Sequence, residues 1–277
     1  MPDILFEKRA GGVALITLNR PESLNAMGGE LMPLLSRYLD ESEGDGDVRC
    51  VAITGAGRAF CAGGDVRGMQ RRNDDGGSEA ASARPASAVA GLESGVRGLR
   101  ASQDAVSLKL HTMGKPTVAL VNGHAVGAGM SIALACDIRI CGENAKFGTA
   151  FRNVGLSGDY GGSFFLQRLV GAGRARELYL TAEIIDAKRA FELGIANRVV
   201  PQENLLEEGL AFCARLAAGP TATYARMKAN LNLAETAPLA AVLDQEALNM
   251  RLSSLSTDSR EAVLAFVEKR EPRFVGE

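Results

Sequence analysis

The chain has 277 residues, 46% of them hydrophobic, and its 33 acidic and 31 basic side chains give a formal net charge of −2. This length can bury a large core in one or two domains. The balanced charge, without a long basic run, disfavours nucleic acid or an anionic membrane as a partner.

The first half of the chain predicts alternating strands and helices. Residues 4–9 and 13–18 flank Gly11-Gly12, a pattern typical of a β-hairpin. Leucines at helical spacing from Leu31 to Leu39 predict a helix that ends near Gly44. Further short apolar strands are expected at 49–54, 117–121 and 137–141, with helices over 89–111 and from about residue 128.

The second half is mostly helical in pattern from Ser163 onward. The expected helices are 163–169, 173–181, 186–193, 203–218, 221–235, 239–254 and 259–270. Strand–helix units followed by helices indicate an α/β core over residues 1–200 and a helical C-terminal region over 201–277.

Features that would indicate another compartment or a metal are missing from the sequence. No run of about 18 apolar residues could span a bilayer, and residues 1–20 lack the pattern of a secretion signal. The five cysteines have no CxxC spacing, and the two histidines are thirteen residues apart. We therefore expect a cytoplasmic protein without a zinc site.

Two glycine-rich stretches, 60–65 and 122–129, each follow an apolar, strand-like run. Such loops leave backbone N–H groups bare, and two of these converging on one point can bind a developing oxyanion. Taken singly, Gly63-Gly64-Asp65 also fits a turn with a capping aspartate, and Gly127-Ala128-Gly129 fits close strand–helix packing. Neither stretch has the spacing of a dinucleotide-binding loop or the lysine of a P-loop.

The order of these pieces resembles one family over essentially the whole chain. The stretches that carry the likeness are 19–26, 54–65, 121–129, Cys136-Asp137, Phe147-Gly148, Gly161-Gly162 and 266–270. Together they are similar to the crotonase superfamily, also called the enoyl-CoA hydratase/isomerase family. The resemblance implies a crotonase (ClpP/crotonase-like) α/β fold of repeated ββα units. Its C-terminal helices would form homotrimers, commonly paired into hexamers.

The resemblance also implies an oxyanion hole made by the backbone N–H groups of Gly64 and Ala128. These would hold the thioester oxygen of an acyl-CoA, so coenzyme A enters as part of the substrate and no separate cofactor or metal is needed. A thioester α-carbon loses a proton only if the enolate oxygen is stabilised, and each such donor is worth roughly 3 kcal/mol in comparable sites. Ala128, near a helix start, adds the positive end of the helix dipole.

For the CoA moiety the resemblance implies a groove beside the first glycine-rich loop. Its residues would be Leu24, Cys61, Ala62, Gly63, Asp65 and Val66. Phe266 and Lys269 are similar to residues that reach CoA, often from a neighbouring subunit. Lys269 would attract a phosphate, although a solvated surface lysine is the alternative interpretation. Residues 70–100 are expected to wall the acyl pocket.

The chain departs from the family pattern at two positions. Hydratases of the family carry two catalytic glutamates, and the corresponding residues here are Ser131 and Phe151. Neither can act as a general base. Asp159 remains in the same neighbourhood, where some isomerases of the family place their acting aspartate. As an alternative, Asp159 would be the N-cap of a helix beginning near Gly161.

A single desolvated aspartate can remove a proton from one carbon and return it to another. We therefore predict an enoyl-CoA isomerase with Asp159 as acid and base, similar above all to the epoxyphenylacetyl-CoA isomerase type. Two alternatives stay open: an enoyl-CoA hydratase (a lyase), and an acyl-CoA-binding protein that has lost catalysis. The roles of Ser131 and Tyr160, which could form hydrogen bonds in the pocket, also stay open.

Overall fold

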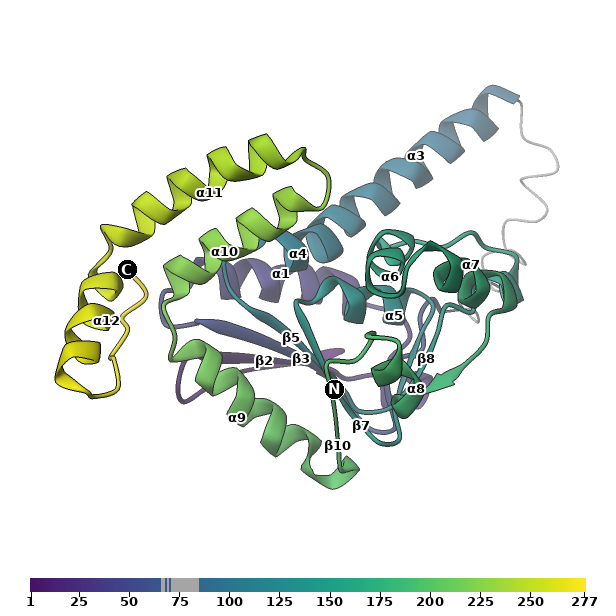
Figure 1. The fold of residues 1–277 in the computed structure, drawn as a ribbon. Helices are drawn as coiled ribbons and strands as arrows, with labels where there is room; N and C mark the ends of the chain where they lie inside the picture. The colour runs from purple at the N-terminus through teal and green to yellow at the C-terminus, as the bar shows by residue number, and fades with distance from the viewer. Residues whose placement is uncertain (66–67, 69, 71–84) are drawn as a thin grey trace.

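The computed structural model, which describes residues 1–65, 68, 70 and 85–277, is built around a six-stranded sheet (Figure 1). The strand order is β1 (Ile4–Arg9), β2 (Val13–Leu18), β3 (Cys50–Gly55), β5 (Thr117–Val121), β7 (Ile138–Gly142) and β10 (Arg198–Val200). β1 and β2 form an antiparallel hairpin in which Ile4 lies opposite Leu18, and the other neighbours are parallel. The expected hairpin and the three expected strands are confirmed. β10, with three residues, is too short to give a periodic signal.

Both faces of this sheet are covered, as a parallel sheet requires. On one face, residues such as Leu15, Ala52 and Leu120 pack against α9 (Leu205–Ala217). On the other face, residues such as Ile16 and Ile53 pack in a second core with α1 (Leu31–Gly44). Figure 1 shows α9 on one side of the strands and α1 on the other. The alternation of neighbouring residues between the two cores follows from the two-residue period of a strand.

A second, four-stranded sheet positions the glycine-rich stretches. Its order is β4 (Ala59–Cys61), β6 (His124–Val126), β8 (Lys146–Gly148) and β9 (Ile185–Asp186). β4, β6 and β8 are parallel, so the loops that leave β4 and β6 emerge at the same edge of the sheet. None of these strands is expected from the sequence, because two or three residues show no period.

The expected helix over 89–111 is interrupted. It consists of α3 (Pro85–Gln103), a π-helical turn (Asp104–Leu108) and α4 (Lys109–Thr112). The side chains of residues 89–101 are exposed, and Figure 1 shows α3 projecting from the body of the molecule. The helix expected near residue 128 is α5 (Ala128–Ala135), and every one of its residues is buried.

The C-terminal half confirms the expected helices. Besides α9 they are α6 (Gly162–Val170), α7 (Ala172–Thr181), α8 (Ala187–Glu192), α10 (Thr221–Ala234), α11 (Leu239–Ser254) and α12 (Thr257–Glu268). α11 and α12 lie away from the sheets in Figure 1, whereas α10 packs on the body of the molecule, where Asn232 donates to the His111 carbonyl on α4 at 2.9 Å. Within the described ranges no helix is both long and apolar enough to cross a membrane.

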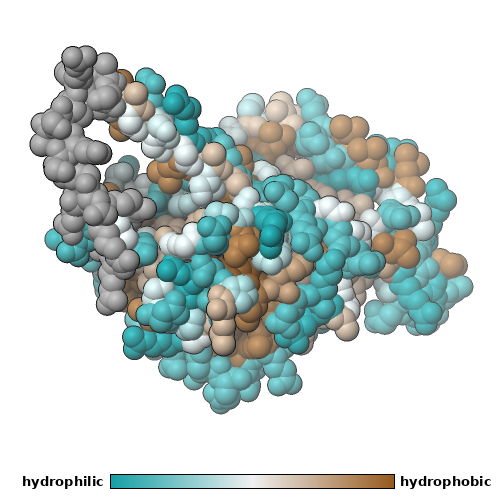
Figure 2. Space-filling model, turned by 180° about the vertical axis from the view of Figure 1, so that it is seen from behind, coloured by the Kyte–Doolittle hydropathy of each residue, from teal (hydrophilic) through white to brown (hydrophobic). Residues whose placement is uncertain are grey.

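The last three helices expose many large apolar side chains. Those more than half exposed are Met227, Leu231, Leu239, Leu243, Leu248, Met250, Leu255, Val263, Phe266 and Val267. Figure 2 shows the molecule from behind, where brown apolar side chains are interspersed with polar ones at the C-terminal end. The same view shows a further apolar strip near the centre of that face.

Candidate active site

The two glycine-rich loops touch each other at positions where only glycine fits. Gly63 has φ +88°, and a Cβ there would lie 2.7 Å from the Val126 carbonyl oxygen and 3.3 Å from the Ala128 nitrogen. A Cβ on Gly129 would overlap the carbonyl oxygen of Cys61. The glycines therefore allow the two backbones to approach closely, which a side chain at either position would prevent.

This approach leaves two amides available. Gly64 follows Gly63, whose carbonyl accepts the Met27 N–H at 2.7 Å, and Ala128 opens α5 after Gly127. The first N–H groups of a helix have no partner inside it. Among the described residues, neither the Gly64 nor the Ala128 N–H donates a backbone hydrogen bond. Within the described part of the chain, both N–H groups can therefore donate to an anionic oxygen.

A cavity of about 190 Å³ lies beside these amides. Its lining comes from the first loop, the second loop and the segment between β8 and α6. The residues are Ala62, Gly64, Val126, Gly127, Ala128, Ala150, Phe151, Asn153, Val154, Leu156 and Asp159. Gly64, Ala128 and Asp159, predicted from distant parts of the sequence, line one cavity.

Asp159 is the acidic side chain of this cavity and is half-buried. Its Oδ1 is shielded from solvent and has no hydrogen-bond partner within the described part of the chain. Burial raises the pKa of the Asp159 carboxyl above its ordinary value, because a desolvated carboxylate is disfavoured. A base with a raised pKa is better matched to taking a proton from carbon.

The alternative interpretation of Asp159, as a helix cap, is wrong. α6 begins at Gly162, its N-cap residue is Gly161, and no side chain makes a capping hydrogen bond. Asp159 contributes only its backbone carbonyl, which accepts the Gly162 N–H at 3.2 Å. The side chain is left for the cavity.

The positions at which the resemblance expects glutamates supply no base. Phe151 lines the cavity and stacks against Tyr179, with 6.2 Å between ring centroids. Ser131 is buried in α5, and its Oγ lies 3.4 Å from the carbonyl oxygen of Gly127. Neither Ser131 nor Tyr160 lines the cavity.

The residues predicted for the CoA groove lie beside the cavity in part. The Leu24 carbonyl accepts the Ala62 N–H at 3.0 Å, so these two residues are adjacent. Cys61 is fully buried, and desolvation raises the pKa of its thiol to about 12, which leaves only its backbone for a ligand. Asp65 accepts the Gly68 N–H at 3.0 Å, and Val66 lies outside the described residues.

The other predicted contacts are remote from the cavity within one chain. Phe266, on α12, is 86% exposed, and Lys269 caps that helix with φ +56°. Figure 1 places α12 at the opposite end of the molecule from α5 and α6. Of the segment expected to wall the acyl pocket, residues 71–84 lie outside the described part, and residues 89–100 are exposed on α3.

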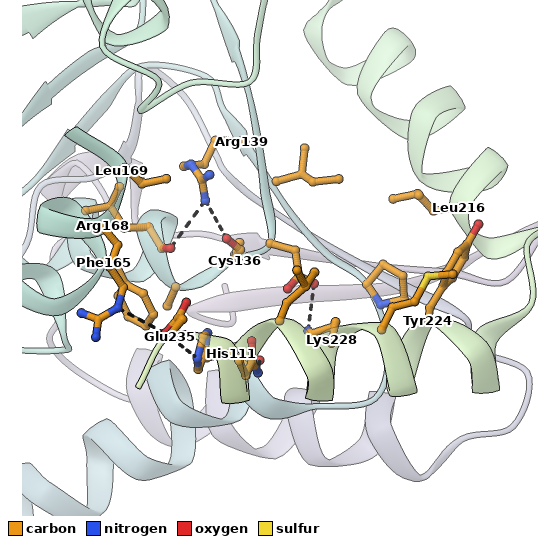
Figure 3. A pocket seen from close by; sticks show the side chains of 18 residues that line it. His111, Cys136, Arg139, Phe165, Arg168, Leu169, Leu216, Tyr224, Lys228 and Glu235 are labelled. Atoms are coloured by element: carbon orange, nitrogen blue, oxygen red, sulfur yellow. Dashed lines mark hydrogen bonds and ion pairs between the residues drawn. The ribbon is translucent and has the colours of Figure 1, made fainter. Parts of the chain in front are cut away.

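A larger cavity, of about 420 Å³, lies between α10 and the ends of α5 and α6 (Figure 3). Lys228 forms an ion pair with Asp137 at 2.8 Å, and Glu235 lies 3.4 Å from Arg168. Arg139 donates to the backbone carbonyls of Ile195 and Cys136, both at 2.6 Å. Because these charged side chains are partnered, we expect substitutions among them to affect the fold rather than turnover.

Comparisons with known proteins show the family and the fold of the chain. The family model described as enoyl-CoA hydratase/isomerase matches residues 8–277. The 1,2-epoxyphenylacetyl-CoA isomerase of Escherichia coli (strain K12) is 38% identical over 276 residues, which is 100% of both chains. The short-chain-enoyl-CoA hydratase of Clostridium acetobutylicum is 31% identical, covering 97% of this chain and 95% of its own length. A solved enoyl-CoA hydratase/isomerase from Mycobacterium abscessus is 35% identical, with a TM-score of 0.89 over 99% of this chain and 100% of that one.

Proposed function

Because the chain belongs to the enoyl-CoA hydratase/isomerase family and has the crotonase fold, we propose that it moves a double bond in an enoyl-CoA thioester. The observation that carries the proposal is that Asp159, the one acidic side chain among the described residues of the cavity, lines it together with Gly64 and Ala128. Hydration must activate water and deliver a proton, which suits two carboxylates. A double-bond shift needs only one group that accepts and returns a proton.

The proposed reaction proceeds through an enolate. The Asp159 carboxylate takes a proton from the carbon α or γ to the thioester carbonyl, and the electron pair moves onto the carbonyl oxygen. The N–H groups of Gly64 and Ala128 stabilise that oxygen, aided by the positive end of α5. Protonated Asp159 then returns the proton to the other carbon, and the carbonyl re-forms with the double bond displaced.

Coenzyme A is proposed to bind as part of the thioester, along Leu24 and Ala62 and the backbone of 61–66. Phe266 and Lys269 would reach it from another copy of the chain, because α12, which carries them, lies at the other end of the molecule from α5 and α6 (Figure 1). The exposed apolar side chains of α10 to α12 support a homotrimer, or a hexamer of two trimers. Sedimentation should give three or six times the chain mass of 29.1 kDa; a monomer would contradict the assembly.

Two other functions compete with isomerisation. Hydratases are named among the relatives at 31% identity and above, so Asp159 with an unconventional partner could hydrate 2-enoyl-CoA. The replacement of both glutamate positions by Ser131 and Phe151 would also fit a binder that has lost catalysis. The 38% identical relative is named for an epoxide thioester, 1,2-epoxyphenylacetyl-CoA, which therefore belongs in the test panel.

One assay separates these possibilities. Purified protein is given 3-enoyl-CoA, 2-enoyl-CoA and 1,2-epoxyphenylacetyl-CoA, and products are identified by mass and by the absorbance of the conjugated thioester. We expect 3-enoyl-CoA to become 2-enoyl-CoA without a change in mass. Exclusive formation of the 3-hydroxyacyl product would establish the hydratase, and CoA-thioester binding without turnover across the panel would favour the binder.

A further inference from the structure

The segment that carries Asp159 has an unusual backbone. Tyr160, the next residue, has φ +50°, and it lies between Gly158 at φ +107° and Gly161 at φ +74°. Glycine adopts such angles easily, but a tyrosine does so rarely. A non-glycine residue persists in this conformation only when its surroundings determine it. Something must therefore hold Tyr160 in place.

The end of α3 makes the contacts that do so. The Tyr160 N–H donates to Oε1 of Gln103 at 3.2 Å, and the Tyr160 hydroxyl lies 2.8 Å from Oγ of Ser102. One contact holds the backbone and the other holds the far end of the ring, so both the position and the rotation of Tyr160 are restrained. Tyr160 is 6% exposed, and losing a partner there leaves a polar group without water to replace it.

Ser102 and Gln103 occupy a special place in α3. They are its last two residues, directly before the π-helical turn at Asp104–Leu108. Residues 89–101 of the same helix are exposed, whereas Ser102 and Gln103 are half-buried. Single π-helical turns frequently occur at functional sites. The contact between α3 and the Asp159 segment is thus concentrated in these two side chains.

We propose that Gln103 and Ser102 are positioning residues for the reaction: by holding Tyr160, they keep the Asp159 carboxyl inside the cavity beside the Gly64 and Ala128 amides. This inference rests on the proposed function of Asp159. Neither Gln103 nor Ser102 lines the cavity, so they act on the reaction through Tyr160. Without the Gln103 acceptor the segment relaxes, Asp159 gains water, and the pKa of its carboxyl falls toward the ordinary value.

The buried phenols and the thiol near Asp159 do not titrate in acid. The nearby phenols are Tyr160 and Tyr179, and burial raises the pKa of both, that of Tyr179 to about 12. The Cys61 thiol near Tyr160 also has a pKa of about 12 because it is desolvated. Arg100, on α3, and Asp104, in the π-helical turn, form an ion pair at 3.0 Å. We therefore expect the acidic limb of the rate profile to report Asp159.

The test replaces Gln103 by methionine, which has a similar length but no acceptor oxygen. For Gln103→Met we expect kcat to fall about tenfold or more, with KM within about twofold, because misplaced reacting groups lose rate rather than binding. We also expect the acidic limb of kcat/KM to move to lower pH. Gln103→Glu keeps an acceptor and should restore kcat, while its added negative charge moves the limb to higher pH. Gln167→Met, on the exposed face of α6, is the matched control.

Two outcomes would overturn the inference. The first is that Gln103→Met keeps the wild-type kcat and the acidic limb of its kcat/KM profile does not move. The second is that Gln103→Met loses rate and has a lower unfolding midpoint while the acidic limb stays in place, which indicates a structural role only. If Gln103→Met does not fold, Ser102→Ala is measured in its place with the same limb as the readout. Asp159→Asn distinguishes a failure of the positioning role from a failure of the proposed function. If Asp159→Asn is inactive and Gln103→Met behaves as the wild type, only the positioning role is wrong. If Asp159→Asn is active, the proposed function itself is wrong.

Discussion

The cavity at Asp159 and the larger cavity between α10 and the ends of α5 and α6 differ in whether their polar groups have hydrogen-bond or ion-pair partners. In the first, Oδ1 of Asp159 is buried without a partner, and the Gly64 and Ala128 amides donate no backbone hydrogen bond within the described residues. In the second, drawn in Figure 3, Lys228 is paired with Asp137. The second cavity is the larger, about 420 Å³ against about 190 Å³.

From this difference we expect unsatisfied polar groups to indicate a reaction site better than cavity size does. A buried carboxyl without a partner costs stability, and such a cost is common where a perturbed pKa serves a reaction. In a buried ion pair each charge offsets the desolvation cost of the other, and removing one partner leaves an unpaired charge that harms the fold. Substitutions at the first cavity should therefore affect turnover, and substitutions at the second should affect stability.

The largest effect is expected for Asp159→Asn. Removing a general base lowers the rate by about 10² to 10⁴-fold, while affinity for CoA thioesters stays within a few fold because the amides and the CoA groove are untouched. Single-turnover kinetics and calorimetric titration measure the two quantities. The control is Asp47→Asn, which replaces an exposed aspartate distant in sequence from Asp159. If Asp159→Asn turned over near the wild-type rate, the expectation that the first cavity governs turnover would be wrong.

The next largest effect is expected for Gly63→Ala. The added Cβ meets the Val126 carbonyl at 2.7 Å and lies 3.3 Å from the Ala128 nitrogen, and φ is +88°, so the two loops must separate. Disturbing one oxyanion donor costs about 10² to 10³-fold in kcat. Gly173→Ala in α7 has nothing within 4 Å of its Cβ and is the matched control. Equal kcat for both variants would show that the loops tolerate separation.

A smaller, graded effect is expected for pH. Isomerisation needs the Asp159 carboxylate, and burial raises the pKa of this carboxyl, so kcat/KM should rise with pH through that raised value. Below it the rate falls about tenfold per pH unit, as for a single base. The same group binds protons more tightly folded than unfolded, so it lowers stability as pH rises above its unfolded pKa. Asp159→Asn should remove both trends; a pH profile unaltered in shape would contradict the assignment.

The smallest effect on turnover is expected at the second cavity. Lys228→Met breaks a pair whose side chains are 11% and 26% exposed, and Asp137 keeps the Thr117 N–H as a donor at 2.7 Å. We expect a loss of about 2 to 3 kcal/mol in the free energy of unfolding, less than for a fully enclosed pair. Urea titration at fixed protein concentration measures it. Turnover per folded molecule should stay unchanged, and a fall like that of Asp159→Asn would refute the comparison.

Much of the fold is predictable from the sequence. The hairpin at 4–18, the strands at 50–55 and 117–121 and the helices after residue 162 follow from periodicity and from glycine and proline positions. The second sheet is not predictable, because β4, β6 and β8 have three residues each and are formed by pairing with distant neighbours. The π-helical turn at Asp104–Leu108 is not predictable either, because helical periodicity continues on both sides of it.

The site divides in the same way. The motifs of the sequence indicated the family, and the resemblance to that family nominated Gly64, Ala128 and Asp159 and placed Ser131 and Phe151 at the two glutamate positions. Only the tertiary structure decided that Asp159 enters the cavity rather than capping α6, and that Tyr160 is held by Gln103. Composition and local spacing determine which elements form. The burial of a carboxyl and the partner of an amide depend on chain segments far away in sequence, which come together only on folding.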